Sequence, residues 1–219
     1  MDRNSRPYHY GDLRSALVDT GVKLARTGGV NALGLREVTR SVGVTPNAAY
    51  RHFADQRALV VAVARQVQDL LAGAMLEKMQ AVPEGSASGE RALARLRGVG
   101  LGYIEFAVSE PGWFELAFLT QDDPEGDAPS VTIEGDIPPP YQLLVDTLDD
   151  MLLTGALTSE QRVNAEWSCW SAVHGFADLV TRGPLQTQSR AVIDVLASSV
   201  VEAIIDGIRT QPDTKTSTI

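Results

Sequence analysis

Residues 35–53 read L-R-E-V-T-R-S-V-G-V-T-P-N-A-A-Y-R-H-F, and this stretch decides the fold. In its first half the apolar residues recur at helical spacing, at Leu35, Val38 and Val42. Gly43 then predicts the end of a helix, because glycine enters the left-handed region without a Cβ penalty. Thr45 and Pro46 are the residue types of an N-cap and a first helical position. The stretch therefore predicts two short helices joined by a tight turn.

The second of these helices is about two turns long and predicts one buried side and one exposed side. Ala49 and Phe53 are expected to face inward, with Val44 packing where the helix begins. The exposed side combines small polar residues with later aromatic and basic ones: Thr45, Asn47, Ala48, Tyr50, Arg51 and His52. Small leading side chains can approach base edges in a major groove, while the later ones reach phosphate oxygens. We interpret this helix as the recognition helix of a helix-turn-helix.

The charge distribution supports contact with nucleic acid at one end of the chain only. The 219 residues carry a formal net charge of −9, which argues against a general nucleic-acid binder. Residues 1–53 nevertheless hold eight lysines and arginines against four acids, a local charge of +4, and the remainder carries −13. A basic first segment followed by an acidic body fits a protein that touches phosphate with one end.

The sequence G-V-T-P-N-A-A-Y-R-H-F followed by A-D-Q-R-A-L-V, at residues 43–60, resembles the signature of the TetR/AcrR family of bacterial transcriptional regulators. The resemblance covers residues 8–65 and implies an N-terminal three-helix domain that binds double-stranded DNA. The residues expected to contact DNA are Arg36, Thr45, Pro46, Asn47, Ala48, Tyr50, Arg51, His52, Gln56 and Arg57.

Several positions depart from the family pattern. Gly34 stands where the family usually has a Ser or Thr cap that often contacts phosphate, and Thr39 replaces the alanine commonly packed between the two helices. Gln56 occupies the place of a phosphate-binding lysine, with Arg57 beside it, so either of the two could meet DNA. Arg3 and Arg6 lie in an aperiodic N-terminal arm, which is either a minor-groove contact or simply a disordered end.

Periodicity and helix-stop signals predict an all-α chain of about nine helices: an N-terminal three-helix helix-turn-helix domain plus a C-terminal helical bundle. The predicted domains are residues 8–54, which bind DNA, and residues 55–210, which bind an effector and dimerise. The helices expected after the first domain cover residues 55–82, 90–109, 113–119, 141–153, 158–182 and 189–209. Three glycines in the second of these helices, at Gly98, Gly100 and Gly102, favour close packing or a cavity-lining bend over a phosphate loop.

The helix over residues 189–209 carries an apolar band too wide for packing on one side only. The family resemblance implies that two helices from each subunit form a four-helix dimer interface, and the wide band agrees with it. The alternative is an ordinary buried terminal helix. The residues expected at a homodimer interface are Val192, Leu196, Val200, Ile204 and Ile208.

Trp170 to Gly175 resembles the Trp…His-Gly element of the WHG-type C-terminal domain found in some members of the family, a resemblance that spans residues 90–205. Aromatic residues also concentrate in this half. Core filling is one account of them, and a pocket between helices for a small apolar or aromatic effector is the other. His174 is either a structural histidine or a polar ligand contact. The residues expected to bind an effector are Tyr103, Phe106, Trp113, Phe114, Phe118, Trp167, Trp170 and His174.

The sequence offers little support for an enzyme, a metal site or a cofactor. Ser171, His174 and Asp178 share one helix, which cannot arrange a nucleophile, a base and an orienting acid around a substrate, and no G-x-S-x-G motif is present. Histidines and the single cysteine, Cys169, lack metal-ligand spacing. That lone cysteine fits a reducing compartment, and no segment resembles a signal peptide or approaches the length of a membrane span.

The sequence thus predicts a cytoplasmic, ligand-responsive regulator, without a cofactor and without a membrane partner, whose dimer binds a palindromic operator. The helix over residues 55–82 would tilt when effector binds and so move the two recognition helices away from their spacing of about 34–36 Å. Repression is an expectation from the family. Two alternatives remain: a DNA-binding regulator without an effector, and a helical small-molecule carrier or enzyme.

Overall fold

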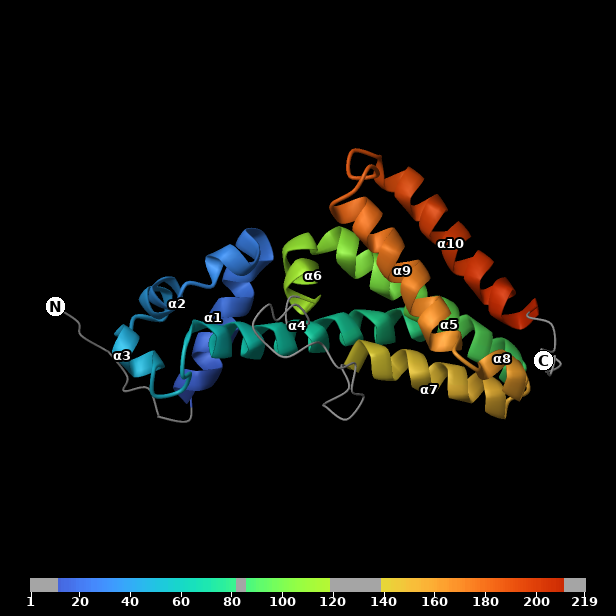
Figure 1. Cartoon of the computed structure of the whole chain (residues 1–219), viewed down its shortest axis with the longest axis horizontal. Helices are drawn as coiled ribbons and strands as arrows, with labels where there is room; N and C mark the ends of the chain where they lie inside the picture. The colour runs from blue at the N-terminus through green and yellow to red at the C-terminus, as the bar shows by residue number, and fades with distance from the viewer. Residues whose placement is uncertain (1–11, 82–85, 119–138, 211–219) are drawn as a thin grey trace, which may run out of the picture. The chain divides into compact units, whose positions relative to one another are not determined.

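The computed structural model describes residues 12–81, 86–118 and 139–210, and within them it contains ten α-helices, one short 3-10 helix and no strand (Figure 1). The all-α prediction is confirmed. The arm with Arg3 and Arg6, residues 82–85 and 119–138, and the C-terminal end lie outside the described residues. The elements are α1 (Asp12–Gly28), η1 (Gly29–Ala32), α2 (Leu35–Val42), α3 (Pro46–Ala49), α4 (Gln56–Met79), α5 (Ser88–Ser109), α6 (Pro111–Phe118), α7 (Pro139–Leu153), α8 (Ser159–Arg162), α9 (Ala165–Thr181) and α10 (Arg190–Thr210).

The predicted helix-turn-helix forms, but its second helix, α3, spans four residues, so the expected length of about two turns is wrong. Gly43 ends α2 with a φ of 82°, and its N–H donates to the carbonyls of Thr39 and Arg40 at 3.0 and 3.1 Å. Pro46 begins α3 after Thr45, whose backbone is extended. Ala49 and Phe53 are buried, as predicted. The stretch therefore folds into two short helices around one left-handed glycine.

The long helix α4 begins after Asp55, whose Oδ1 accepts a hydrogen bond from the N–H of Ala58 at 2.8 Å. Its buried stripe recurs every four residues, at Leu59, Val63, Val67, Leu71, Met75 and Met79. By length and composition this helix could cross a membrane, so the prediction that no segment approaches that length is wrong. A long core helix also requires such an apolar stripe, and the stripe of α4 is buried within this chain.

Several predicted helix boundaries differ from those of the structure. The helix expected over residues 158–182 is interrupted: Val163 is extended and Asn164 is left-handed with a φ of 60°, so α8 and α9 are separate helices. Asparagine is among the few residues that tolerate this conformation. Thr158 and Gln161 form a capping box at the start of α8. Helix α7 begins at Pro139 and not at residue 141 as expected, because proline is favoured in a first helical turn.

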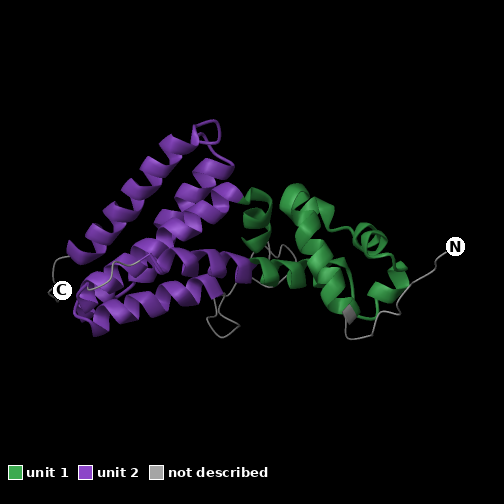
Figure 2. Ribbon diagram, turned by 180° about the vertical axis from the view of Figure 1, so that it is seen from behind, with its two compact units in different colours: residues 1–67, 110–131 green, residues 68–109, 132–219 purple. Residues whose placement is uncertain are grey.

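The chain divides into two compact units, each described by itself (Figure 2). The first unit includes residues 1–67 and 110–131, so its described part contains α1 to α3, the first half of α4, and α6. The second includes residues 68–109 and 132–219, which hold the rest of α4, α5 and α7 to α10. Helix α4 contributes to both units. The predicted domain boundary after residue 54 stays a prediction.

In the second unit, two glycines of α5 allow its backbone to approach α4 closely. A Cβ placed on Gly98 would lie 2.8 Å from the carbonyl of Lys78, and one on Gly102 would lie 2.7 Å from the Cα of Met75. Helix α5 nevertheless runs unbroken through all three glycines. The glycines therefore serve close packing rather than a bend.

Candidate nucleic-acid interface and interior pocket

The short recognition segment, residues 45–53, presents most of its predicted contact residues to solvent. Ala49 and Phe53 anchor it in the core of the first unit, while Tyr50 is 55% exposed. Ala48 is half-buried. The exposed members of the predicted DNA-contact set are Arg36, Thr45, Pro46, Asn47, Tyr50, Arg51, Gln56 and Arg57.

His52 differs from its neighbours. The residue is half-buried, and its Nε2 is buried without a hydrogen-bond partner within the described residues. This nitrogen is covered, unlike the exposed side chains of Asn47 and Tyr50. The whole set of DNA contacts stays a prediction, and the geometry favours its exposed members.

The departures from the family pattern have local explanations. Thr39 is buried, and its hydroxyl donates to the carbonyl of Leu35 at 2.8 Å, so the extra polar atom is satisfied within α2. Thr45 precedes α3 without a side-chain capping bond, and Gly34 precedes α2 without a side chain to make one. The Thr45 hydroxyl is therefore not used for capping within its own helix.

Two further arginines beside this segment are held by other side chains. The guanidinium of Arg40 donates to both carboxylate oxygens of Glu37, at 2.6 and 2.5 Å. The guanidinium of Arg14 lies 5.2 Å from the ring centroid of Phe53, a cation–π geometry, and Arg14 is exposed. Sequence reasoning missed Arg14 as a candidate phosphate contact, because its distance in sequence from residues 45–53 hides this placement.

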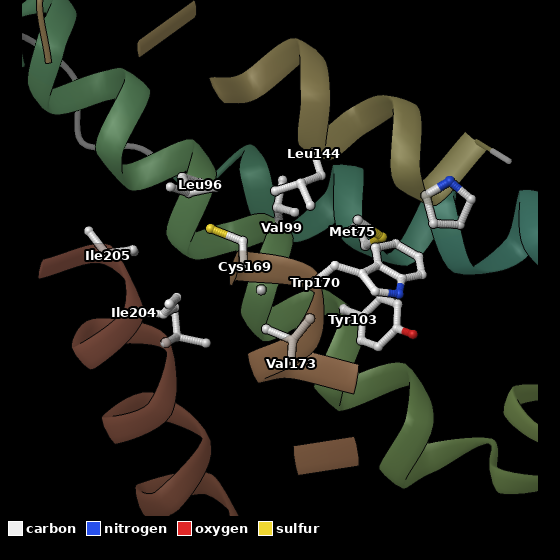
Figure 3. A pocket seen from close by; sticks show the side chains of 13 residues that line it. Met75, Leu96, Val99, Tyr103, Leu144, Cys169, Trp170, Val173, Ile204 and Ile205 are labelled. Carbon is white, nitrogen blue, oxygen red and sulfur yellow. The ribbon is translucent and has the colours of Figure 1, made fainter. Parts of the chain in front are cut away.

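An apolar pocket lies within the second unit, between α4, α5, α7, α9 and α10 (Figure 3). Its cavity volume is about 20 Å³, little more than one water molecule needs, so a larger molecule must widen it. The lining contains no formally charged residue: Met75, Leu96, Val99, Gly100, Tyr103, Pro140, Leu144, Cys169, Trp170, Val173, Val201, Ile204 and Ile205. A site of this composition suits a neutral, apolar molecule.

The pocket contains two of the eight residues expected to bind an effector, Tyr103 and Trp170. His174 is joined to them, because its Nδ1 lies 2.7 Å from the Tyr103 hydroxyl and its ring stacks on Trp170 at 6.3 Å. Trp167 is partly exposed and packs against Tyr141, which in turn contacts Trp170. One aromatic row therefore leads from the surface to the pocket wall.

The other four predicted effector residues do not line this pocket. Phe106 is buried on α5. Trp113, Phe114 and Phe118 belong to α6, in the first unit. Conversely, sequence reasoning missed the aliphatic lining and Cys169. These residues have the spacing of ordinary core residues, so no sequence signal distinguishes them.

Burial keeps the polar groups of the pocket wall neutral. It lowers the pKa of His174, an effect that Arg182 reinforces and Asp178 partly opposes. It raises the pKa of Tyr103 far above its usual value and, together with Glu166, raises the pKa of the Cys169 thiol to about 12. We therefore assign the phenol O–H as the donor to a neutral imidazole. Cys169 is a thiol at neutral pH and is not activated for nucleophilic chemistry.

We expect the stability of the protein to fall as pH decreases from 7.5 to 5, partly because of His174. Below the ordinary histidine pKa of about 6.5 the unfolded chain takes up a proton that the folded chain resists, so stability is lost as pH falls through the lowered folded value. Replacing His174 by glutamine should make the melting temperature less dependent on pH over this range. Equal pH dependence in both proteins would contradict the neutral assignment.

The serine, histidine and acid of α9 do not form a catalytic arrangement. His174 Nδ1 is engaged by Tyr103, Asp178 pairs with Arg182 at 2.5 Å, and Ser171 is exposed. Among the described residues no group of three His, Cys, Asp or Glu side chains is placed to hold a metal ion.

The predicted interface residues of α10 do not share one exposed face. Val192 is exposed, whereas Leu196 and Val200 are half-buried. Ile204 lines the pocket and Ile208 is fully covered within its own chain. Sequence reasoning missed Val195, which is 70% exposed. The apolar band thus divides into a covered side and an open side.

Comparison with known proteins identifies both parts of the chain. Residues 17–63 match the family described as bacterial regulatory proteins, tetR family, and residues 96–204 match the tetracyclin repressor-like, C-terminal domain. An uncharacterized HTH-type transcriptional regulator, YobS of Bacillus subtilis (strain 168), is 23% identical over 193 residues, or 86% of this chain and 87% of YobS. The finer WHG-type assignment stays a prediction.

Solved structures share the fold. A protein of unknown function from Rhodococcus sp. RHA1 is 22% identical with a TM-score of 0.72, covering 94% of this chain and all of its own. A putative transcriptional regulator from Pseudomonas aeruginosa PAO1 is 14% identical with a TM-score of 0.60, covering 95% and 96%. PfmR, a TetR family regulator from Thermus thermophilus, is 13% identical with a TM-score of 0.53, covering 87% and 97%. The chain belongs to the TetR family of bacterial DNA-binding transcriptional regulators.

Proposed function

We propose that this regulator is a cytoplasmic repressor that binds a palindromic operator as a homodimer and is released by a small, neutral, apolar or aromatic effector. The observation that supports the proposal is the uncharged pocket lined in part by α5. Helix α5 also packs directly on α4 through Gly98 and Gly102. An effector that displaces α5 would displace a helix that continues into the DNA-binding unit. The switch follows if the effector binds the released conformation more tightly than the DNA-bound one.

The composition of the pocket restricts the effector. A carboxylate or ammonium group would lose its hydration without an opposite charge among the lining residues, which costs several kcal/mol by a rough estimate. Tyr103 offers one hydroxyl, which already contacts His174. A neutral molecule with at most one or two polar atoms fits best.

The open side of the α9–α10 pair supports the homodimer. On α10, Val192 and Val195 are exposed and Leu196 and Val200 are half-buried, and on α9 Leu179 is exposed. Such a surface on two packed helices is suited to association with its own copy. Two-fold symmetry would then present two recognition segments to the half-sites of one duplex.

The experiment has two stages. Fragments of the source genome bound by the full-length protein give the operator, and sedimentation of the complex should find two chains per duplex. Neutral apolar compounds are then titrated against the complex, and we expect at least one class to lower operator affinity about tenfold or more. A single chain per palindromic duplex, or a set of compounds that never changes operator affinity, would contradict the dimer or the switch respectively.

A pocket-filling variant tests where the effector acts. Ile204→Trp places a large ring into the lining, so we expect it to weaken the response to an active compound by about tenfold or more. The matched control is Leu153→Trp at the end of α7, an exposed position outside the lining. An unchanged response in Ile204→Trp would place the effector elsewhere.

A further inference from the structure

Helix α6 belongs to the DNA-binding unit, although it follows α5 in the sequence. It packs on α1 and η1, and with them it forms part of the first compact unit (Figure 2). Its aromatic residues, which the sequence analysis assigns to an effector site, therefore lie in the other unit from the pocket. The chain returns to the first unit immediately after the last residue of α5.

Side chains at the start of α6 hold α1 at two points. The indole Nε1 of Trp113 donates to the main-chain carbonyl of Val22 at 2.7 Å. Arg26 donates through Nε and Nη2 to the two carboxylate oxygens of Glu110, at 2.7 and 2.5 Å, and its guanidinium lies 5.2 Å from the Trp113 ring centroid. The Glu110 side chain is only 17% exposed. A bidentate pair beside an aromatic ring is more directional than an ordinary surface ion pair.

The backbones of α6 and α1 are also in close contact. A Cβ placed on Gly112 would lie 2.6 Å from the carbonyl oxygen of Arg26 and 2.7 Å from that of Ala25. These neighbours are main-chain atoms of α1, so they cannot move aside as a flexible side chain would. Glycine at residue 112 is therefore required for this approach of α6 to α1.

We propose that α6 adds a fourth helix to the N-terminal three-helix domain of α1, α2 and α3, and that Glu110, Gly112 and Trp113 are positioning residues for α1. Helix α1 packs against both α2 and α3, so its placement determines how the recognition segment is presented. None of the three residues needs to touch DNA. The proposal goes beyond the effector switch, because it holds whether or not an effector exists.

In the first test, electrostatics and positioning predict opposite changes in operator affinity for one substitution. In the full-length protein, Glu110→Gln removes a negative charge from the DNA-binding unit, so electrostatics alone would strengthen binding to the selected operator duplex or leave it unchanged. The positioning role predicts the reverse, a loss of about three- to tenfold. Asp150→Asn is the matched control, because it breaks the Arg95–Asp150 pair between α5 and α7. Tighter or unchanged binding in Glu110→Gln overturns the proposal.

The second test uses glycines. Gly112→Ala should weaken operator binding about tenfold and speed amide hydrogen exchange in α1, with exchange in α9 unchanged. Gly207→Ala in α10 is the control, since a Cβ there meets nothing within 4 Å, and it should change neither quantity. Equal behaviour of the two variants in affinity and exchange overturns the proposal, even if both fold.

Discussion

Replacing Tyr50 by alanine is expected to weaken operator binding by about 10- to 100-fold without lowering the melting temperature. The side chain is 55% exposed and follows buried Ala49, so little packing is lost on truncation. In a helix-turn-helix an exposed tyrosine at this point of the recognition helix can reach a phosphate or a base edge. Fluorescence anisotropy with the selected operator duplex, at one fixed salt concentration, measures the loss.

A comparison with Asn47 separates the two kinds of contact. If Asn47 reads a base edge, Asn47→Ala should reduce discrimination between operator and mismatched duplex. If Tyr50 contacts phosphate, its truncation should weaken binding to both duplexes about equally. Leu153→Ala, a change at an exposed apolar residue of the second unit, is a control that should leave both affinities unchanged. Wild-type affinity in Tyr50→Ala would place the DNA-reading face elsewhere.

The helix-turn-helix could be predicted from sequence because its determinants are local. Gly43, Pro46 and the apolar spacing act within one or two helical turns, and each fixes a conformation by itself. The capping box at Thr158 was predictable for the same reason. The break at Asn164 was missed, because asparagine only permits a left-handed conformation and does not require it.

The pocket and the position of α6 depend on tertiary contacts that have no local signature. Ile204 and Val173 line a pocket, whereas Ile208 is simply buried, yet all three look alike in an apolar helix. Trp113 was expected to bind an effector because aromatic residues suit both pockets and cores. Its indole instead donates to Val22, far away in the sequence. Composition indicates that a side chain will be covered, but not by which helix.

Replacing Gly102 by alanine should lower the free energy of unfolding by about 1–2 kcal/mol, although alanine is the better helix former. The new Cβ would lie 2.7 Å from the Cα of Met75 and 3.1 Å from the carbonyl oxygen of Ala74, both main-chain atoms of α4. Helix propensity contributes up to about 1 kcal/mol in the opposite direction, so a net loss requires that the two backbones touch. The melting temperature should fall by about 2–4 °C for each kcal/mol lost.

Gly175→Ala is the matched control on α9, because a Cβ there meets nothing within 4 Å, and propensity alone should raise stability slightly. A rise in the stability of both variants would show that the backbones of α5 and α4 are not in contact. A fall in Gly102→Ala alone means that α4 and α5 meet through main-chain atoms. Gly100 and Tyr103 of α5 line the pocket. A molecule that enters the pocket and displaces α5 would therefore move α4 as well, because no flexible side chains between the two backbones would be compressed first. Operator affinity in Gly102→Ala should then change together with stability, whereas in Gly175→Ala it should not.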